Sequence, residues 1–242
     1  LNGHMKAIWF RTPKTASTSI RVALLGFNTR NFVEEFDVTN HNRLHREGEK
    51  KFTATDLLRI MSDNFPLSDF PGKYLAGDFP RDTHICQVNS EQWCSYRDRY
   101  REFFDDAYKF SQCRHPLSRF VSSYNYTLKH DFEFKKALSM LLDGSAKTDW
   151  SVHDYHHTRP QTDILPMYDD KLLLDKLMRL ESLQSDFDHV CTHLGIPRLK
   201  LLHTRKSTSK EVSKHYTEYY DSESEAMARE YFKKDFDILG YK

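Results

Sequence analysis

Three short apolar segments, each followed by a helical pattern, constrain the fold of this chain more than any other feature. The segments are residues 6–11 (KAIWFR), 107–113 (AYKFSQC) and 176–180 (KLMRL), and the helical patterns are residues 18–25, a stretch beginning at Pro116, and residues 183–194. Short apolar runs that alternate with helices are typical of a parallel sheet covered by those helices. We therefore predict an α/β fold in a single domain.

The remaining patterns fit the same fold. They predict a loop at residues 31–51, helices at residues 53–61 and 223–234, a short strand at residues 73–76, and a left-handed helix cap at Gly195. These segments add elements to the sheet and its covering helices without indicating a second domain.

Composition excludes several classes of protein. The chain has 242 residues, the length of one domain, and its 36 Lys and Arg against 35 Asp and Glu leave a net charge of +1, which argues against a nucleic-acid-binding protein. No apolar run approaches the roughly 18 residues of a membrane span. The four cysteines form no CxxC pair, which favours ordinary thiols in a reducing compartment.

The first residues suggest how the chain was produced. We interpret residues 1–4 as an expression remnant, because Met5 is followed at once by a strand-like segment, and residues 5–242 as the domain. With Met5 as the native start, the protein is expected in the cytoplasm. The alternative is the Golgi lumen, after removal of an N-terminal anchor.

Four hydroxyl residues and a lysine lie between the first expected strand and its helix. The segment PKTASTS contains Lys14, Thr15, Ser17, Thr18 and Ser19. At a helix N-terminus unpaired backbone N–H groups and the helix dipole favour an anion, and small side chains let a phosphate or sulfate approach closely. The segment predicts an anion-binding turn, although the same residues also suit a well-capped helix. The GxxxxGK[ST] pattern of ATP- and GTP-binding loops is absent.

A second candidate segment, RHPLSRFVSSY, follows the expected strand 107–113. Arg114 lies at the exit of that strand, and Ser122 lies about two turns into the next helix. A bent connection could bring the guanidinium and the hydroxyl onto one phosphate. The alternative is a surface arginine in an ion pair and a serine that faces water.

Taken together in this order, the two segments resemble the paired phosphate-binding motifs of sulfotransferases that use 3′-phosphoadenosine 5′-phosphosulfate (PAPS). The resemblance is closest to the carbohydrate-type branch, which includes heparan and uronyl 2-O-sulfotransferases and bacterial relatives. It continues in residues 157–161 (HTRPQ), similar to the HWxPQ segment of that branch, in residues 177–197 and 205–208 (RKST), and in the ending DFDILGY. It implies a P-loop NTPase-like central parallel sheet. It also implies sulfuryl transfer from PAPS to a hydroxyl of a carbohydrate or small molecule, with 3′-phosphoadenosine 5′-phosphate (PAP) as product and no metal.

The resemblance also implies roles for individual residues. The 5′-phosphosulfate would be surrounded by the first segment, through Thr15, Ala16, Ser17, Thr18 and Ser19. Lys14 would neutralise the charge that develops on the leaving phosphate. The 3′-phosphate would be held by Arg114 and Ser122. A late loop that closes over the nucleotide is suggested by Lys206, Ser207 and Thr208, and His157 would contact the acceptor.

The group that accepts the proton is where the sequence departs from the family pattern. Much of this branch has a histidine after a glycine at the end of a strand, whereas the corresponding stretch here is LAGDFP, with Asp78 in its place. A carboxylate whose pKa is raised by burial could act as the base. Asp78 is therefore the first candidate and His84 the second, with another residue or loss of activity as the remaining outcomes.

Three alternatives stay open at this stage. The HxxHH pattern of His153, His156 and His157 could face a metal on a helix, although the family reaction needs none. A small-molecule kinase on a similar fold is disfavoured because the GxxxxGK[ST] pattern of ATP- and GTP-binding loops is absent. A non-catalytic relative that binds PAP or PAPS would explain Asp78 as a lost base.

Overall fold

A three-stranded parallel sheet lies at the centre of the protein. The computed structural model describes residues 7–20, 23–24, 90–99, 101–202 and 214–242. The sheet has the order β1-β2-β5 and consists of β1 (Ala7–Phe10), β2 (Tyr108–Cys113) and β5 (Lys176–Arg179). Each strand agrees with the predicted segment to within one residue at either end. All four residues of β1 are buried, as expected of a parallel strand covered on both faces.

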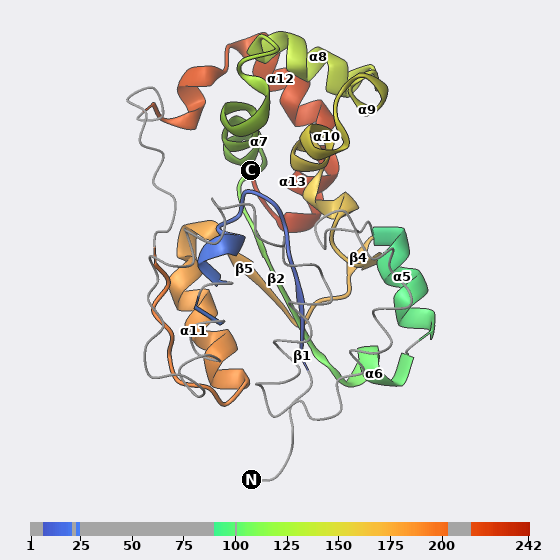
Figure 1. Ribbon diagram of the computed structural model, residues 1–242, viewed down its shortest axis with the longest axis vertical. Helices are drawn as coiled ribbons and strands as arrows, with labels where there is room; N and C mark the ends of the chain where they lie inside the picture. Colours follow the sequence, from blue (N-terminus) through green and yellow to red (C-terminus); the bar gives the residue numbers. More distant parts are fainter. Residues whose placement is uncertain (1–6, 21–22, 25–89, 100, 203–213) are drawn as a thin grey trace, which may run out of the picture.

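Helices surround this sheet and extend beyond it (Figure 1). Residues 17–20 and 23–24 are helical, in agreement with the predicted first helix. The other described helical elements are α5 (Ser90–Arg99), α6 (Arg101–Asp106), α7 (Pro116–Ser123), the π-helix η2 (Tyr124–Leu128), α8 (Phe134–Leu142), α9 (Ala146–Asp149), α10 (Val152–Thr158), η3 (Gln161–Asp163), η4 (Leu180–Ser182), α11 (Leu183–His193), η6 (Tyr216–Tyr219), α12 (Ser222–Tyr231) and α13 (Lys233–Leu239). Two short strands, β3 (Met167–Tyr168) and β4 (Lys171–Leu172), pair antiparallel at the side of the sheet.

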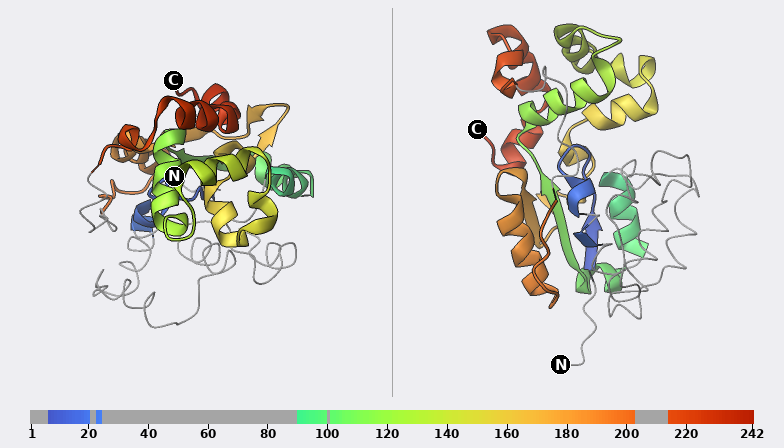
Figure 2. Two further views of the ribbon diagram at one scale, coloured as in Figure 1. Left: turned by 90° about the horizontal axis from the view of Figure 1, so that it is seen from above. Right: turned by 60° about the vertical axis from the view of Figure 1, so that its left-hand side comes forward.

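The sheet is covered on both sides. Helix α11 lies on one side and α5 on the other, as both figures show (Figures 1 and 2). The apolar core joins the strands to α11 through side chains such as Phe110, Met178, Phe187 and Val190. This arrangement confirms the predicted α/β fold.

A second group of helices lies beyond the carboxyl ends of the strands (Figure 2). Helices α7, α8, α9, α12 and α13 share a separate apolar cluster that includes Phe120, Leu138 and Phe232. Ligands of open parallel sheets bind outside the carboxyl ends of the strands. The carboxyl ends of the strands, next to this helical group, are therefore the place to look for a site.

The C-terminal region differs from its prediction. One helix over residues 223–234 was expected, but α12 ends at Tyr231 and α13 begins at Lys233. Phe232 between them has φ −95° and ψ 16°, and its fully buried ring belongs to the helical cluster. Packing of this ring redirects the chain, so that Asp235 and Phe236 are buried.

Left-handed glycines end two of the helices. Gly195 follows α11 with φ 65°, which confirms the predicted cap, and Gly240 caps α13 with φ 67°. The predicted loop, helix and strand within residues 31–76 lie outside the described residues. In the described part of the chain, no helix has the length and apolar character needed to cross a membrane.

Candidate functional site

The turn between β1 and the first helix has an unusual backbone. Lys14 has φ 63° and Ala16 has φ 60°, a left-handed conformation that destabilises a residue with a side chain by about 1–3 kcal/mol and is concentrated at ligand sites. The Thr15 hydroxyl donates to the Thr12 carbonyl at 2.7 Å, and the backbone N–H of Ser19 donates to the Ala16 carbonyl at 2.9 Å. These bonds fix the turn in a conformation that its own sequence does not favour.

The hydroxyls of this turn differ in their surroundings. Thr15 is fully buried and its hydroxyl is directed to Thr12, while the Ser17 hydroxyl accepts a bond from Arg11 Nε at 3.1 Å. Thr18 is partly exposed, and Ser19 lines a cavity. The Thr15 and Ser17 hydroxyls therefore take part in hydrogen bonds that hold the turn itself.

Arg114 brings the second segment onto this turn. Its Nη1 donates to the backbone carbonyl of Lys14 at 3.4 Å, and its Nε donates to the Ser118 hydroxyl at 3.0 Å. Burial lowers the pKa of the Arg114 guanidinium, which stays charged at neutral pH. Two segments 100 residues apart thus share one site. Ser122 is partly exposed on α7.

A buried carboxylate fixes the backbone of Arg114 through the side chain of Gln161. The Gln161 side chain accepts from the backbone N–H of Arg114 at 3.0 Å and donates to its carbonyl at 2.9 Å. Asp235 of α13, fully buried, accepts bonds from the backbone and side chain of both Gln161 and Thr162, at 2.8–3.2 Å. The sequence resemblance included Gln161 and Asp235 only as parts of two matching segments, without a role.

Arg119 is a residue of the site that the sequence did not indicate. It is fully buried on α7, where its Nε donates to the Pro13 carbonyl at 3.1 Å and its Nη1 donates to the Arg159 carbonyl at 2.8 Å. Its Nη2 is buried without a hydrogen-bond partner in the structure. Burial lowers the Arg119 pKa to about 10, so a buried positive charge lies directly behind the turn. The only sequence signal was an arginine between the apolar residues of an amphipathic helix.

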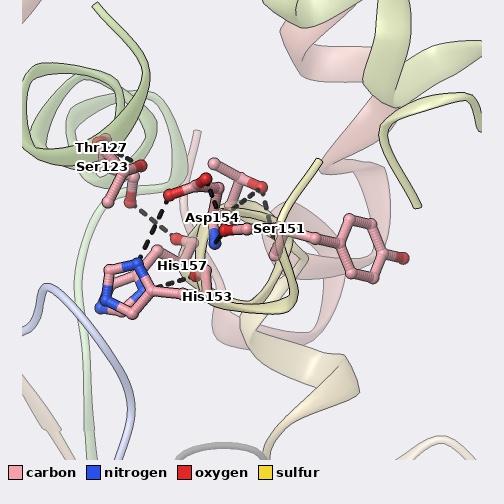
Figure 3. A network of polar contacts seen from close by, with 8 residues as sticks. Ser123, Thr127, Ser151, His153, Asp154 and His157 are labelled. Carbon is pink, nitrogen blue, oxygen red and sulfur yellow. Dashed lines mark hydrogen bonds and ion pairs between the residues drawn. The ribbon is translucent and has the colours of Figure 1, made fainter. Parts of the chain in front are cut away.

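His157 lies near the end of α10, and its ring lies next to that of His153 (Figure 3). Its Nδ1 is 2.8 Å from the His153 carbonyl, and the Ser123 hydroxyl of α7 donates to the His157 carbonyl at 2.7 Å. Tyr126 of the π-helix η2 connects this histidine to the turn. Its ring is 5.4 Å from that of His157, and Lys14 Nζ lies 3.8 Å from the centre of the Tyr126 ring.

A cavity of about 350 Å³ adjoins the first turn. It is lined by Ala16 and Ser19 of the turn, by residues 180–185 of η4 and the first turn of α11, and by Leu201 and Leu202. Its walls are mainly apolar side chains and small hydroxyls, with Glu181 and Gln184 as further polar groups, a lining that suits a flat ring of a ligand.

The site accordingly combines a left-handed turn, two arginines that donate to its backbone carbonyls, and an adjoining cavity. A model of the sulfotransferase family matches residues 1–242. The chain belongs to the sulfotransferase family. That family includes carbohydrate sulfotransferases, and the parallel sheet with flanking helices is consistent with its P-loop-like fold. No curated protein and no solved structure matches the chain.

Membership of the family confirms the predicted family and the predicted enzyme class. This sulfotransferase transfers sulfuryl groups, which sets aside the kinase and the non-catalytic relative as first interpretations. Within the described residues, no three histidine, cysteine or acidic side chains are grouped so that they could hold a metal ion. Five expected site residues lie outside the described residues: Asp78, His84, Lys206, Ser207 and Thr208.

Proposed function

We propose that this sulfotransferase takes the sulfuryl group from PAPS and transfers it to a hydroxyl of a carbohydrate or another small molecule. The observation that carries the proposal is the contact between Arg114 and the Lys14 carbonyl. PAPS carries a phosphosulfate at one end of its ribose and a separate phosphate on the 3′-oxygen. A donor of this kind needs two cationic positions side by side, and Lys14 and Arg114 supply them.

The binding roles follow from the same contacts. The turn at residues 15–19 holds the phosphosulfate at the start of a helix, where an anion is favoured. Arg114 and Ser122 hold the 3′-phosphate, and the adenine base occupies the cavity lined by Ala16 and Ser19. Lys206, Ser207 and Thr208 are proposed to close over the nucleotide.

The transfer is an in-line displacement. The acceptor oxygen forms a bond to sulfur while the bond from sulfur to the bridging oxygen of the 5′-phosphate breaks, and its electron pair remains on PAP. The Lys14 ammonium stabilises this developing negative charge, and the buried charge of Arg119 adds to the positive potential behind the turn. A carbohydrate acceptor is supported by the family, which includes carbohydrate sulfotransferases.

Thermal stability in the presence of nucleotides tests the donor. PAP, ADP and AMP are compared at equal millimolar concentrations. All three contain adenosine with a 5′-phosphate, and among them only PAP carries a 3′-phosphate. A ligand at 100 times its Kd stabilises the native state by about 2.7 kcal/mol, which corresponds to roughly 5–10 °C in Tm for a chain of this size. We expect this shift with PAP and a much smaller one with ADP and AMP. Equal shifts with PAP and ADP, or no shift with any of them, would contradict the proposal.

A variant makes the test specific to the 3′-phosphate. Arg114→Ala removes a charge-assisted contact, so PAP affinity is expected to fall on the order of 100-fold, to that of AMP. AMP affinity should change little, because AMP has no 3′-phosphate. Unaltered PAP affinity in Arg114→Ala would remove Arg114 from the donor site.

A further inference from the structure

The hydrogen bond of the His157 ring fixes which of its nitrogens is open to a proton. Nδ1 lies 2.8 Å from the backbone carbonyl of His153, and a carbonyl oxygen can only accept. The neutral ring therefore carries its hydrogen on Nδ1 and a lone pair on Nε2. The His153 ring lies beside it, with ring centres 4.3 Å apart (Figure 3).

Helix α7 holds this imidazole and the Lys14 turn in one frame. Arg119 donates to the Pro13 carbonyl, directly before Lys14, and one turn later the Ser123 hydroxyl donates to the His157 carbonyl. Tyr126, in the π-helix that continues α7, contacts both the Lys14 ammonium and the His157 ring. π-Helical turns inside helices occur frequently at functional sites. Lys14 and His157 thus both contact the Tyr126 ring, and α7 bonds to both of their segments.

We propose that His157 is the general base of the sulfuryl transfer. This assignment rests on the proposed use of PAPS, because it places the sulfur beside Lys14. As the acceptor oxygen bonds to sulfur, its proton moves to Nε2 of His157, and the bond from sulfur to the 5′-phosphate of PAP breaks. The resulting imidazolium keeps its Nδ1–H bond to the His153 carbonyl and later releases the Nε2 proton to water. His157 takes the role for which the sequence suggested Asp78 or His84.

The charges around His157 link its basicity to the donor. The His157 pKa is lowered to about 3, chiefly by burial and further by the positive charges of His153, Lys14 and Arg119, while the hydrogen bond to the His153 carbonyl acts in the opposite direction. The His156 and Tyr126 rings also lie next to it. The ring is therefore neutral at pH 7. The negative charges of bound PAPS offset those of Lys14 and Arg119, so His157 becomes a stronger base only when the donor is present.

An NMR titration tests this coupling without any acceptor. The histidine rings are labelled with ¹⁵N, and His157 is assigned from the signals missing in His157→Asn. We expect an Nδ1–H ring that stays neutral to about pH 4 in the free protein, and a pKa at least about one unit higher with saturating PAP. A hydrogen on Nε2, or a pKa that PAP leaves unchanged, would overturn the assignment. Failure of PAP to bind at all would instead overturn the proposed donor, and the assignment with it.

Kinetics provide the second test. The Asn side chain of His157→Asn can still donate to the His153 carbonyl but offers no ring nitrogen. Its kcat is expected to fall about 10²–10⁴-fold, with either an acceptor hydroxyl or water as the acceptor of the sulfuryl group from PAPS. PAP affinity should change by about twofold or less, and added imidazole should restore part of the activity of His157→Ala.

The matched control is His189→Asn. It makes the same substitution at an exposed histidine of α11, so we expect kcat within about threefold of the unaltered enzyme. If His157→Asn retains kcat and only raises the KM for the acceptor, His157 contacts the acceptor and is not the base. Loss of kcat in Asp78→Asn or His84→Asn, with kcat retained in His157→Asn, would likewise overturn the assignment.

Discussion

Lys14 combines a mobile positive charge with a backbone that few lysines adopt. Its φ of 63° is maintained by neighbours, through Arg114 on its own carbonyl and Arg119 on the carbonyl of Pro13. The chain thus retains a strained residue at the point where the proposed leaving group develops charge. Strain of this kind persists only where the surrounding structure enforces it, and it is concentrated at functional sites.

Replacement of this lysine should affect the transfer more than the binding of the product. In Lys14→Ala the turn keeps a side chain with a Cβ, but the charge opposite the leaving phosphate is lost. We expect kcat to fall about 10²–10³-fold and PAP affinity to fall by less than about tenfold, because the interaction is strongest in the transition state. Steady-state kinetics and PAP titration measure the two quantities.

A surface lysine provides the comparison for this variant. Lys136→Ala on the exposed side of α8 should leave both quantities within about twofold. Equal losses of kcat and PAP affinity in Lys14→Ala would show that Lys14 binds ground state and transition state alike, and would contradict the transition-state role.

At the scale of the elements, α13 stabilises the site through one carboxylate. Asp235 accepts four hydrogen bonds from Gln161 and Thr162, and Gln161 in turn pairs with the backbone of Arg114. The segment nearest the C-terminus thus determines where the proposed 3′-phosphate ligand lies. A substitution in α13 that breaks these bonds should therefore weaken nucleotide binding.

Asp235→Asn tests this connection. The amide has one acceptor oxygen instead of two, and its NH₂ group faces N–H donors, so the free energy of unfolding should fall by at least about 2 kcal/mol. PAP affinity should fall with it, since Gln161 no longer fixes Arg114. Denaturant unfolding and PAP titration measure both effects. Asp237→Asn, on the exposed side of the same helix, should change stability by less than about 0.5 kcal/mol. Equal stability of the two variants would contradict the role of Asp235.

The elements differ in how far their sequence determines them. Strand β1 could be predicted because a strand buried on both faces needs an uninterrupted apolar run, which is visible locally. Strand β2 could be predicted from its alternation of apolar and polar residues. The break at Phe232 could not, because it depends on a ring that packs against residues far away in the chain. A helical pattern continues through this position, and only tertiary packing ends it.

The candidate site shows the same division. Lys14 and Arg114 belong to contiguous segments whose residue types already indicate an anion, so the sequence pointed to them. Arg119 and Asp235 are charged residues in a buried environment, and a sequence pattern predicts such residues on the surface. Their partners, the carbonyl of Pro13 and the amides at 161–162, lie 106 and 73–74 residues away. Long-range pairs of this kind become visible only in the fold.

For the molecule as a whole, His157 should make the free energy of unfolding depend on pH. The His157 pKa is lowered to about 3 in the native state, whereas an unperturbed histidine titrates near 6.5. Between these values the unfolded chain binds a proton that the native protein does not, so acidification favours unfolding in this window. Above about pH 6.5 the ring is neutral in both states, and this dependence disappears.

Comparison of the unaltered enzyme with His157→Asn separates the contribution of His157 to this pH dependence from that of the other titrating groups. Burial also lowers the pKa of His115 and raises that of Asp163, and the two act in opposite directions on acidification. We therefore expect the Tm of the unaltered enzyme to fall more steeply between pH 6.5 and about 4 than that of His157→Asn, with the two slopes equal above pH 7. Saturating PAP should reduce the difference, because a donor site filled with negative charge raises the native pKa of His157 towards its unfolded value. Parallel curves for the two proteins throughout the acid range would show that the imidazole is protonated in the native state as readily as in the unfolded chain.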